Sequence, residues 1–272
     1  MSISFLLYVN FEVEDYAKIC SSSQNILKMK ASLTRRFLHL FIGAFMSISA
    51  LTVTAQSTSK YNGLGTLLTP DNCVLILIDH QPFQFGTLGS TNSQTVLNNV
   101  IGLAKTAKVF KVPTLLTSVI EDRGGYIVKG LTDLWPEQKP INRTFINAWE
   151  DKRVVDWVKK TGKKKIVIAG LWTEVCVAMP ALQATGEGYE VYVVTDASAG
   201  VSVEAHEMAI QRMIMGGVIP ITFNVFQAEL QRDWARTETI GPLVPILTEH
   251  MGNIGTNIAW EFQLLNAAQQ KK

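Results

Sequence analysis

Short apolar runs that alternate with longer, helix-compatible segments constrain the fold of this chain more than any other feature of its sequence. Five runs are nearly continuous in Val, Ile and Leu, as expected for strands buried on both faces: residues 73–79, 112–118, 165–169, 190–195 and 218–223. The helix candidates are residues 94–110, 149–160, 175–185, 203–215 and 226–235. Strands that alternate with helices predict βαβ units, a mainly parallel sheet and right-handed crossovers.

The composition is that of one globular domain with extra terminal segments. The chain has 272 residues, of which 47% are hydrophobic and 18% charged, and its formal net charge is +2. Nucleic-acid binding would need a clustered basic face. The densest basic run, residues 159–165, is typical of a solvated helix end, with Gly162 as the terminator. We therefore expect no nucleic-acid partner.

The N-terminal region has the order of a secretory signal peptide, with positive charge, an apolar core and small residues. Arg35 and Arg36 precede the apolar stretch 37–53, and Ala55 closes a small-residue cleavage site. Residues 1–28 are then an upstream extension that precedes the true start.

This order divides the chain into residues 1–28, a signal peptide over 29–55, and a mature domain over 56–272 with a helical C-terminal tail. Polar residues interrupt the apolar stretch 37–53, which disfavours a permanent membrane span. The expected location is periplasmic or secreted. A cytoplasmic protein, or one anchored by an N-terminal helix, is the alternative.

Cys176 lies where an apolar strand candidate ends and a helix-compatible segment begins, in the run GLWTEVCVAMPAL. The first N–H groups of a helix lack intrahelical partners, and the helix dipole places partial positive charge there. A thiol at that place is expected to have a lowered pKa and to react as a thiolate. The alternative is an inert cysteine buried in the core.

Asp79 ends the first strand candidate, in the run LIDHQ. Ligands of open parallel sheets bind beyond the carboxyl ends of the strands, where the strand order reverses. If the strands that contain Asp79 and Ala169 are adjacent, Asp79 and Cys176 face one crevice, as a base and a nucleophile do. The alternative for Asp79 is a helix cap or turn residue. His80 and Gln81 are expected to orient this turn or to line the pocket.

Cys73 begins the same strand candidate that Asp79 ends. Six strand steps separate the two by roughly 20 Å, which is too far for a bridge from Cys73 to a cysteine beside Asp79. We therefore expect Cys73 and Cys176 to be free thiols. The sequence contains no dinucleotide or phosphate-binding glycine motif, no nucleophile-elbow serine and no metal-ligand spacing, so no cofactor is expected.

From about Asn72 to Ala235 the chain resembles the isochorismatase-like cysteine hydrolase superfamily, especially its YcaC-like branch. Four segments carry the resemblance: LIDHQ at 77–81, INAWED at 146–151, IAGLWTEVCVAMPAL at 168–182 and VYVVTDASAG at 191–200. The resemblance implies a three-layer α/β/α sandwich around a mainly parallel, doubly wound sheet. It also implies large homo-oligomers and an Asp–Lys–Cys triad for hydrolysis of amides and related bonds.

The resemblance assigns Asp79 as the triad aspartate and Cys176 as the nucleophile. The family lysine falls near Asn142 or Arg143, whereas Lys139 is a few residues too early. Arg143 is the expected replacement, and it would act by charge because a guanidinium does not readily give up a proton. A surface arginine paired with Glu150 or Asp151 is the alternative.

The resemblance also places a cis peptide at Trp172–Thr173, with the N–H groups of Thr173 and Cys176 as an oxyanion hole. It implies a pocket for a small apolar or planar substrate, lined by His80, Gln81, Phe85, Asn147, Trp149 and Trp172. Nicotinamidase-type relatives bind a metal through an Asp-x-His element, which the matching segment 117–126 lacks, so no metal is expected.

The expected activity is hydrolysis of a small amide-like substrate with Cys176 as nucleophile, Asp79 as base and Arg143 in place of the lysine. One alternative is hydrolysis of an enol ether of the isochorismate type, which can depend on the aspartate without the cysteine. Another is a non-catalytic binding or assembly module on the same fold.

Overall fold

The computed structural model describes residues 66–269. The expected upstream extension and signal peptide, residues 1–55, lie outside this part of the chain. Six parallel strands form the central sheet in the order β3-β2-β1-β4-β5-β6. Their bounds are β1 Cys73–Ile78, β2 Thr114–Val119, β3 Ile141–Arg143, β4 Lys165–Gly170, β5 Glu190–Val194 and β6 Ile219–Ile221.

This strand order confirms the doubly wound sheet. The chain winds outward from β1 through β2 to β3 on one side, and from β4 through β5 to β6 on the other. β1 and β4 are neighbours, with Ile78 beside Gly170. The carboxyl ends of β1 and β4 therefore form the switch point at which such sheets bind ligands.

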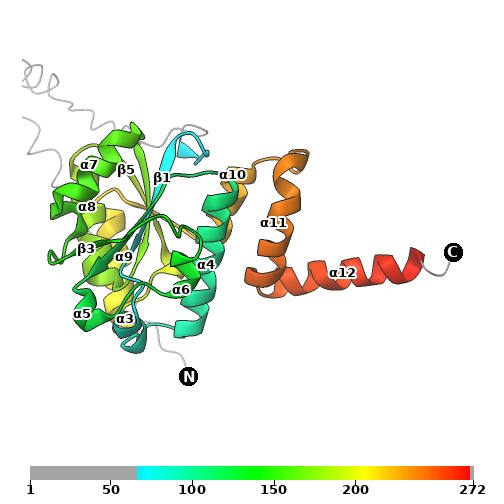
Figure 1. Cartoon of the computed structure of the whole chain (residues 1–272), viewed down its shortest axis with the longest axis horizontal. Coiled ribbons are helices and arrows are strands. Elements are labelled where there is room, and N and C mark those ends of the chain that lie inside the picture. The colour runs from blue at the N-terminus through cyan, green and yellow to red at the C-terminus, as the bar shows by residue number, and fades with distance from the viewer. Residues whose placement is uncertain (1–65, 270–272) are drawn as a thin grey trace, which may run out of the picture. The chain divides into compact units, whose positions relative to one another are not determined.

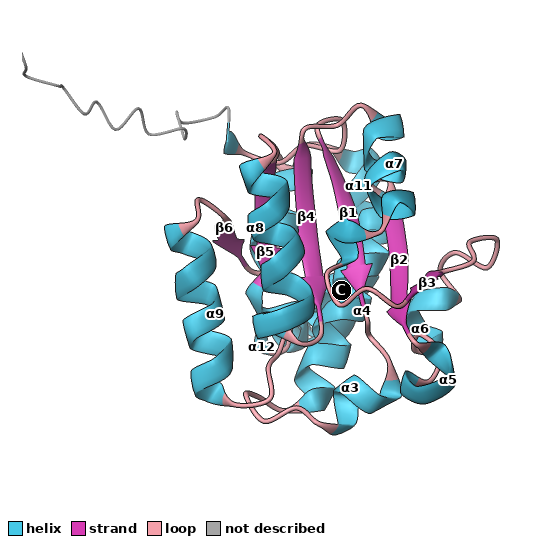
Figure 2. Ribbon diagram, turned by 90° about the vertical axis from the view of Figure 1, so that its left-hand side faces the viewer, coloured by secondary structure: helices cyan, strands magenta, loops and turns pink. Residues whose placement is uncertain are grey.

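Helices cover both faces of the sheet, so the fold is the expected three-layer sandwich (Figure 1, Figure 2). One face packs against α7 (Lys152–Thr161), α8 (Ala178–Gly186) and α9 (Val203–Met215). The other packs against α4 (Ser93–Val109) and α10 (Phe223–Gln231), with α11 (Thr237–His250) against α4. Each face holds its own apolar core, because the strands are buried on both sides.

Local sequence signals explain where the main helices begin and end. The side chains of Asn92, Asp151, Ser202 and Thr222 accept hydrogen bonds from the first turns of α4, α7, α9 and α10. Gly162 ends α7 with a φ of 68°, the left-handed conformation that glycine adopts without penalty. The helix expected from residue 149 begins at Lys152, because 148–150 form a separate 3₁₀ turn before the Asp151 cap.

Several elements were not expected from the sequence. The segment 121–147, in which the sequence indicated no helix or strand, contains α5 (Glu121–Gly124), α6 (Lys129–Thr132) and the edge strand β3. β3 has only three residues, and only one is buried, so it lacks the apolar run of the other strands. α11 contains Pro242 and Pro245, which disfavour a helix interior; its packing on α4 offsets that cost.

The C-terminal helix α12 (Asn253–Gln269) confirms the helical tail and carries exposed apolar side chains. Residues 259–267 are all exposed, and Trp260 and Leu264 retain 60% and 70% of their accessible surface. α12 extends away from the sandwich in Figure 1. Within residues 66–269, no helix combines the length and apolar character that a membrane crossing requires.

Candidate active site

Three side chains from distant parts of the chain meet at the carboxyl ends of the strands. Asp79 follows β1, Arg143 ends β3 and Cys176 follows β4. All three are buried, with 0%, 2% and 6% of their surfaces exposed. The structure therefore places a carboxylate, a guanidinium and a thiol together at the switch point of the sheet.

Asp79 occupies an uncommon backbone conformation at the end of β1. Its φ is 57°, in the left-handed region, and its backbone N–H donates to the Thr117 carbonyl. The chain therefore leaves the strand register at the residue that carries the carboxylate. Asp79 does not cap a helix: α3 (Pro82–Gly86) begins three residues later, with Gln81 at its N-cap position.

Arg143 forms a fully buried ion pair with Asp79, through Nη2 and Oδ2. Its Nη1 donates to the carbonyls of Phe145 and Ile146, the second at 3.0 Å. Arg143 Nε and Asp79 Oδ1 have no hydrogen-bond partner of ordinary geometry. The alternative of a surface arginine is wrong, because the side chain is buried and Asp151 pairs with Arg153 instead.

Cys176 lies in a π-helical turn, Thr173–Val177, that precedes α8. Burial and the nearby Asp79 charge raise the pKa of its thiol to about 12, although Arg143 and the Trp172 backbone N–H act in the opposite direction. The expectation of a lowered pKa is therefore wrong for the free protein. Desolvation and a neighbouring carboxylate outweigh the helix terminus.

The same burial raises the pKa of the Asp79 carboxyl to about 6, while Arg143 and a hydrogen bond with Cys176 lower it. The proton between the two groups therefore resides on sulfur at neutral pH, and Asp79 is ionised. Because Asp79 Oδ1 makes no hydrogen bond of ordinary geometry, we interpret the thiol–carboxyl contact as a loose one. Such contacts often tighten when substrate binds.

The expected cis peptide is one residue displaced: it joins Leu171 to Trp172, not Trp172 to Thr173. The Thr173 N–H donates to Ala199 at 2.9 Å, so it is already bonded and does not serve as an oxyanion donor. Leu171 and Ala199 form a parallel bridge that extends β4 and accounts for this bond. The Trp172 backbone, by contrast, lies close enough to the Cys176 sulfur to lower the pKa of the thiol.

His80 and Gln81 hold the turn rather than line a cavity. His80 is completely buried, its Nε2 lies 3.2 Å from the Ala197 carbonyl, and burial lowers its pKa to about 4. The Gln81 amide bridges to both the N–H and the carbonyl of Val119. Both side chains therefore fix the end of β1 against neighbouring segments, the first of the two roles expected for them.

The remaining expected pocket residues fall into two groups. Trp172 is half-buried at the site, and Phe85 is half-buried against the His80 ring.

Trp149 is 2% exposed and packs edge-on against Tyr189, at the amino end of β5, so a pocket role for it is wrong. Asn147 caps the 3₁₀ turn through the Trp149 N–H and donates to Gln183 at 2.7 Å, so its amide is used structurally.

Sequence reasoning missed Phe83, which is 53% exposed and whose ring centroid lies 6.1 Å from that of Trp172. Phe83, Val119 and Ile120 contribute apolar walls to a cavity of about 430 Å³, which Gln84, Arg123 and Gly124 complete. In Figure 2 the arrowheads of β1 and β2 point toward α3 and α5, the helices that border this cavity. The sequence signal that could have indicated Phe83 is Pro82. Proline favours the first position of a helix, and Phe83 is the next residue of α3.

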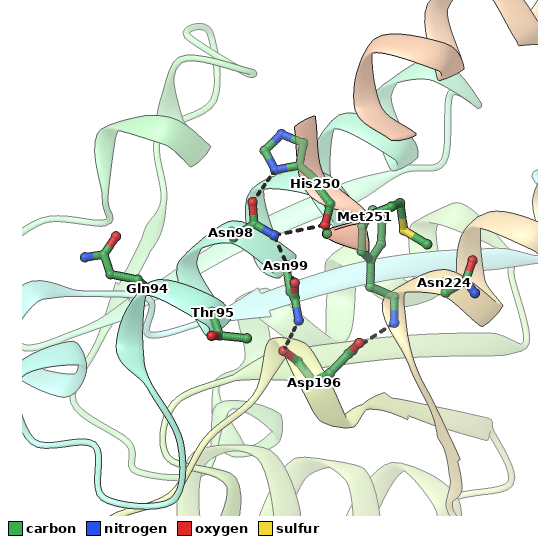
Figure 3. A pocket seen from close by; sticks show the side chains of 10 residues that line it. Gln94, Thr95, Asn98, Asn99, Asp196, Asn224, His250 and Met251 are labelled. Atoms are coloured by element: carbon green, nitrogen blue, oxygen red, sulfur yellow. Dashed lines mark hydrogen bonds between the residues drawn. The ribbon is translucent and has the colours of Figure 1, made fainter. Parts of the chain in front are cut away.

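A separate cavity of about 530 Å³ lies on the α4 and α10 face, away from Cys176. Figure 3 shows its amide side chains joined in a chain of hydrogen bonds, from His250 through Asn98 and Asn99 to Asp196. The Asn98–Asn99 bond lies within α4, and the bonds at its two ends link α4 to His250 of α11 and to Asp196. The network therefore fastens helices together and contains no cysteine.

Cys73 and Cys176 are both free, as expected, and both are buried. Residues 66–269 contain no group of three or more His, Cys, Asp or Glu side chains placed to hold a metal ion.

The fold and site together define an α/β protein with a buried thiol, carboxylate and guanidinium at the switch point of a parallel sheet. A sequence model of the isochorismatase domain matches residues 73–224. The chain belongs to the isochorismatase family, in its YcaC-like branch.

Three comparisons support this branch. The probable hydrolase YcaC of Escherichia coli K12 is 38% identical over 169 residues, which cover 61% of this chain and 81% of that protein. The structure of YcaC from Pseudomonas aeruginosa, with hexane-2,5-diol and covalent acrylamide, has a TM-score of 0.70 at 34% identity, covering 75% of this chain and 99% of that one. The E. coli YcaC structure, described as an octameric hydrolase of unknown specificity, has a TM-score of 0.69 at 35% identity, covering 73% and 97%.

Alkylation tests the protonation state of the Cys176 thiol. With a pKa near 12, Cys176 should react with iodoacetamide at pH 7.5 at least about tenfold more slowly than free cysteine, whose thiol has a pKa of about 8.5. The rate should still increase above pH 9, where free cysteine levels off. Peptide mass spectrometry of the folded protein separates Cys176 from the other cysteines. A rate at pH 7 equal to that of free cysteine would contradict the raised pKa.

Proposed function

We propose that this protein hydrolyses a small amide-like substrate with Cys176 as the nucleophile. The observation that carries the proposal is the burial of the Cys176 thiol beside the Asp79 carboxyl, which is itself paired with Arg143. A nucleophile, a base and a cation in contact match the requirements of nucleophilic catalysis. The hydrolases among the YcaC relatives agree with this reaction class.

In the first step the Cys176 sulfur attacks the carbonyl carbon of the amide. The thiol proton passes to Asp79 as the bond forms, so no free thiolate is needed in the resting protein. The carbonyl oxygen becomes an oxyanion, and the Trp172 N–H beside the sulfur is the candidate donor to it. Collapse of this intermediate breaks the C–N bond, and Asp79 returns the proton to the departing amine.

In the second step water attacks the acyl thioester. Asp79, ionised again, takes a proton from the water, and collapse of the second intermediate breaks the C–S bond while Asp79 returns that proton to the sulfur. The products are the carboxylic acid and the restored thiol of Cys176. One water is consumed over the two steps, and Asp79 serves as base and then as acid in each of them.

Arg143 acts by its charge in this proposal. A guanidinium stays protonated at any ordinary pH, so Arg143 cannot carry the proton between sulfur and nitrogen. Its cation lowers the pKa of both the Asp79 carboxyl and the Cys176 thiol against the opposing effect of burial. It thereby keeps Asp79 available as a base at neutral pH.

The covalent acrylamide in the P. aeruginosa relative is a second, independent support. Acrylamide is a small amide and also an electrophile toward thiols. By likeness to that relative, we propose that the site of this chain admits amides of similar size.

Separate substitutions of Cys176 and Asp79 test the mechanism. Cys176→Ala should reduce hydrolysis of a small primary amide to the background rate, and Asp79→Asn should reduce kcat by about 10²–10⁴-fold, the usual contribution of a general base. Ammonia release measures both, and circular dichroism checks that each variant is folded.

A different pattern would identify a different activity. Loss of an enol-ether hydrolysis in Asp79→Asn, with full activity in Cys176→Ala, would favour the isochorismate-type reaction. The raised pKa of Asp79, at about 6, suits it to protonate an enol ether and motivates that comparison. Saturable amide binding without turnover in the wild type would favour the non-catalytic module.

The dependence of kcat/KM on pH should follow the ionisation of the Asp79 carboxyl. Asp79 acts as base only when ionised, and its pKa is about 6. The value of kcat/KM should therefore be constant near neutral pH and fall about tenfold for each pH unit below 6. Arg143→Gln removes the cation that lowers this pKa, so its acidic limb should lie at higher pH, whereas Arg143→Lys should keep it near the wild-type position. An identical limb in Arg143→Gln would contradict the role given to Arg143.

We also propose that the protein forms homo-oligomers through α12. The YcaC relative from E. coli is octameric. Seventeen helical residues with one charge and several exposed apolar side chains would not be a stable helix alone in water. Contact with another copy of the chain would bury Trp260 and Leu264.

Light scattering after gel filtration tests this assembly. The wild type should have the mass of several protomers, and Trp260→Asp with Leu264→Asp should give a smaller species, because both charges would be buried at the contact. Glu261→Gln, on the same helix, is the control and should keep the wild-type mass. A monomeric wild type, or an unchanged mass in the double variant, would contradict the proposal.

A further inference from the structure

The cavity between α3 and α5 is lined by residues that neighbour those of the proposed reaction site. Val119 pairs with Arg143 in the parallel register of β2 and β3, so their side chains emerge on the same face of the sheet. On the other side, the Phe83 ring contacts the Trp172 ring, and the Trp172 backbone lies close enough to Cys176 to lower the pKa of its thiol. Val119 of the cavity wall is therefore the sheet neighbour of Arg143, and Trp172 lies between Phe83 of the wall and Cys176.

The walls of this cavity are apolar and open to solvent. Phe83 and Ile120 are 53% and 42% exposed, and Val119 is half-buried. Gly124 packs closely on Gln81, because a Cβ there would lie 2.7 Å from the Gln81 amide nitrogen. Ile120 has a φ of 42°, a conformation that β-branched residues rarely adopt. An apolar group of a ligand would fit against Phe83 and Ile120.

Two polar groups in the same cavity lack partners. Gln84 is 5% exposed, and its Oε1 is a buried acceptor without a hydrogen bond. Arg123 is exposed, and its guanidinium forms no ion pair or hydrogen bond with another residue in the described range 66–269. The neighbouring Glu121 carboxylate is already engaged by the Ser118 hydroxyl at 2.6 Å. A ligand could thus satisfy Gln84 with a donor and Arg123 with an anion.

We propose that this cavity binds the far end of the substrate and selects amides whose apolar chain ends in a carboxylate. The scissile carbonyl lies at Cys176, the chain lies against Phe83 and Ile120, and the carboxylate pairs with Arg123. This assignment rests on the proposed amide hydrolysis and names the substrate class for it.

Matched substrates test the selectivity. Glutaramate and adipamate carry a terminal carboxylate, and pentanamide and hexanamide are their uncharged counterparts of equal length. Wild-type kcat/KM should be about tenfold or more higher for the charged member of at least one pair, since a charge-assisted hydrogen bond is worth at least that factor. The preference should decrease with added salt, because Arg123 is exposed.

Arg123→Gln should lower kcat/KM for the charged amides to the level of the uncharged ones and leave the uncharged ones unchanged. Arg123→Lys should recover part of the preference. Lys129→Gln is the matched control, because Lys129 lies in the next helix and pairs with Asp133 outside this cavity. Absence of a preference in the wild type, an equal loss for both amides in Arg123→Gln, or the same change in Lys129→Gln would overturn the proposal.

Calorimetric binding to Cys176→Ala separates this inference from the proposed function. Tighter binding of glutaramate or adipamate than of the matched amide, abolished by Arg123→Gln, supports the subsite even if no amide is hydrolysed. Hydrolysis of the uncharged amides without any preference supports the proposed function and overturns the subsite. Equal or undetectable binding of both members of each pair also overturns the subsite.

Discussion

The candidate site depends on one interaction, the buried ion pair between Asp79 and Arg143. Neither group would be tolerated alone at complete burial, because an unpaired ion in the protein interior costs several kcal/mol. Their pairing joins the end of β1 to the end of the edge strand β3. Arg143 also donates hydrogen bonds to the carbonyls of Phe145 and Ile146. The thiol of Cys176 is then placed beside a carboxylate whose charge the arginine maintains.

This arrangement describes a cysteine that is protonated at rest and activated only during reaction. Burial raises the pKa of both the thiol and the carboxyl, and Arg143 opposes both shifts. A buried, protonated thiol is protected from adventitious electrophiles, whereas an exposed thiolate is not. The turn at Asp79, fixed by His80 and Gln81, and the bridge from Leu171 to Ala199 hold the two reacting groups at adjacent strand ends.

The elements that could be read from the sequence are those whose apolar pattern is strong. The long strands and the helices α4, α8, α9 and α10 lie within a few residues of their expected ranges, because burial on both faces demands continuous apolar runs. β3 escaped notice because three residues with one buried side chain carry no such pattern. Trp149 was misplaced because a motif position says nothing about which way a ring points, and here it points to Tyr189.

The sequence by itself determined the fold class, the placement of Asp79 and Cys176 at strand ends and, through the family resemblance, Arg143 as their partner. Local patterns suffice for these, because periodicity and motif spacing are properties of short segments. Only the tertiary structure decided that the arginine is buried, that the thiol holds its proton, and that Phe83, Gln84 and Arg123 share a cavity beside the site. Charge state and cavity shape depend on desolvation by segments that are distant in sequence, and no local pattern encodes that environment.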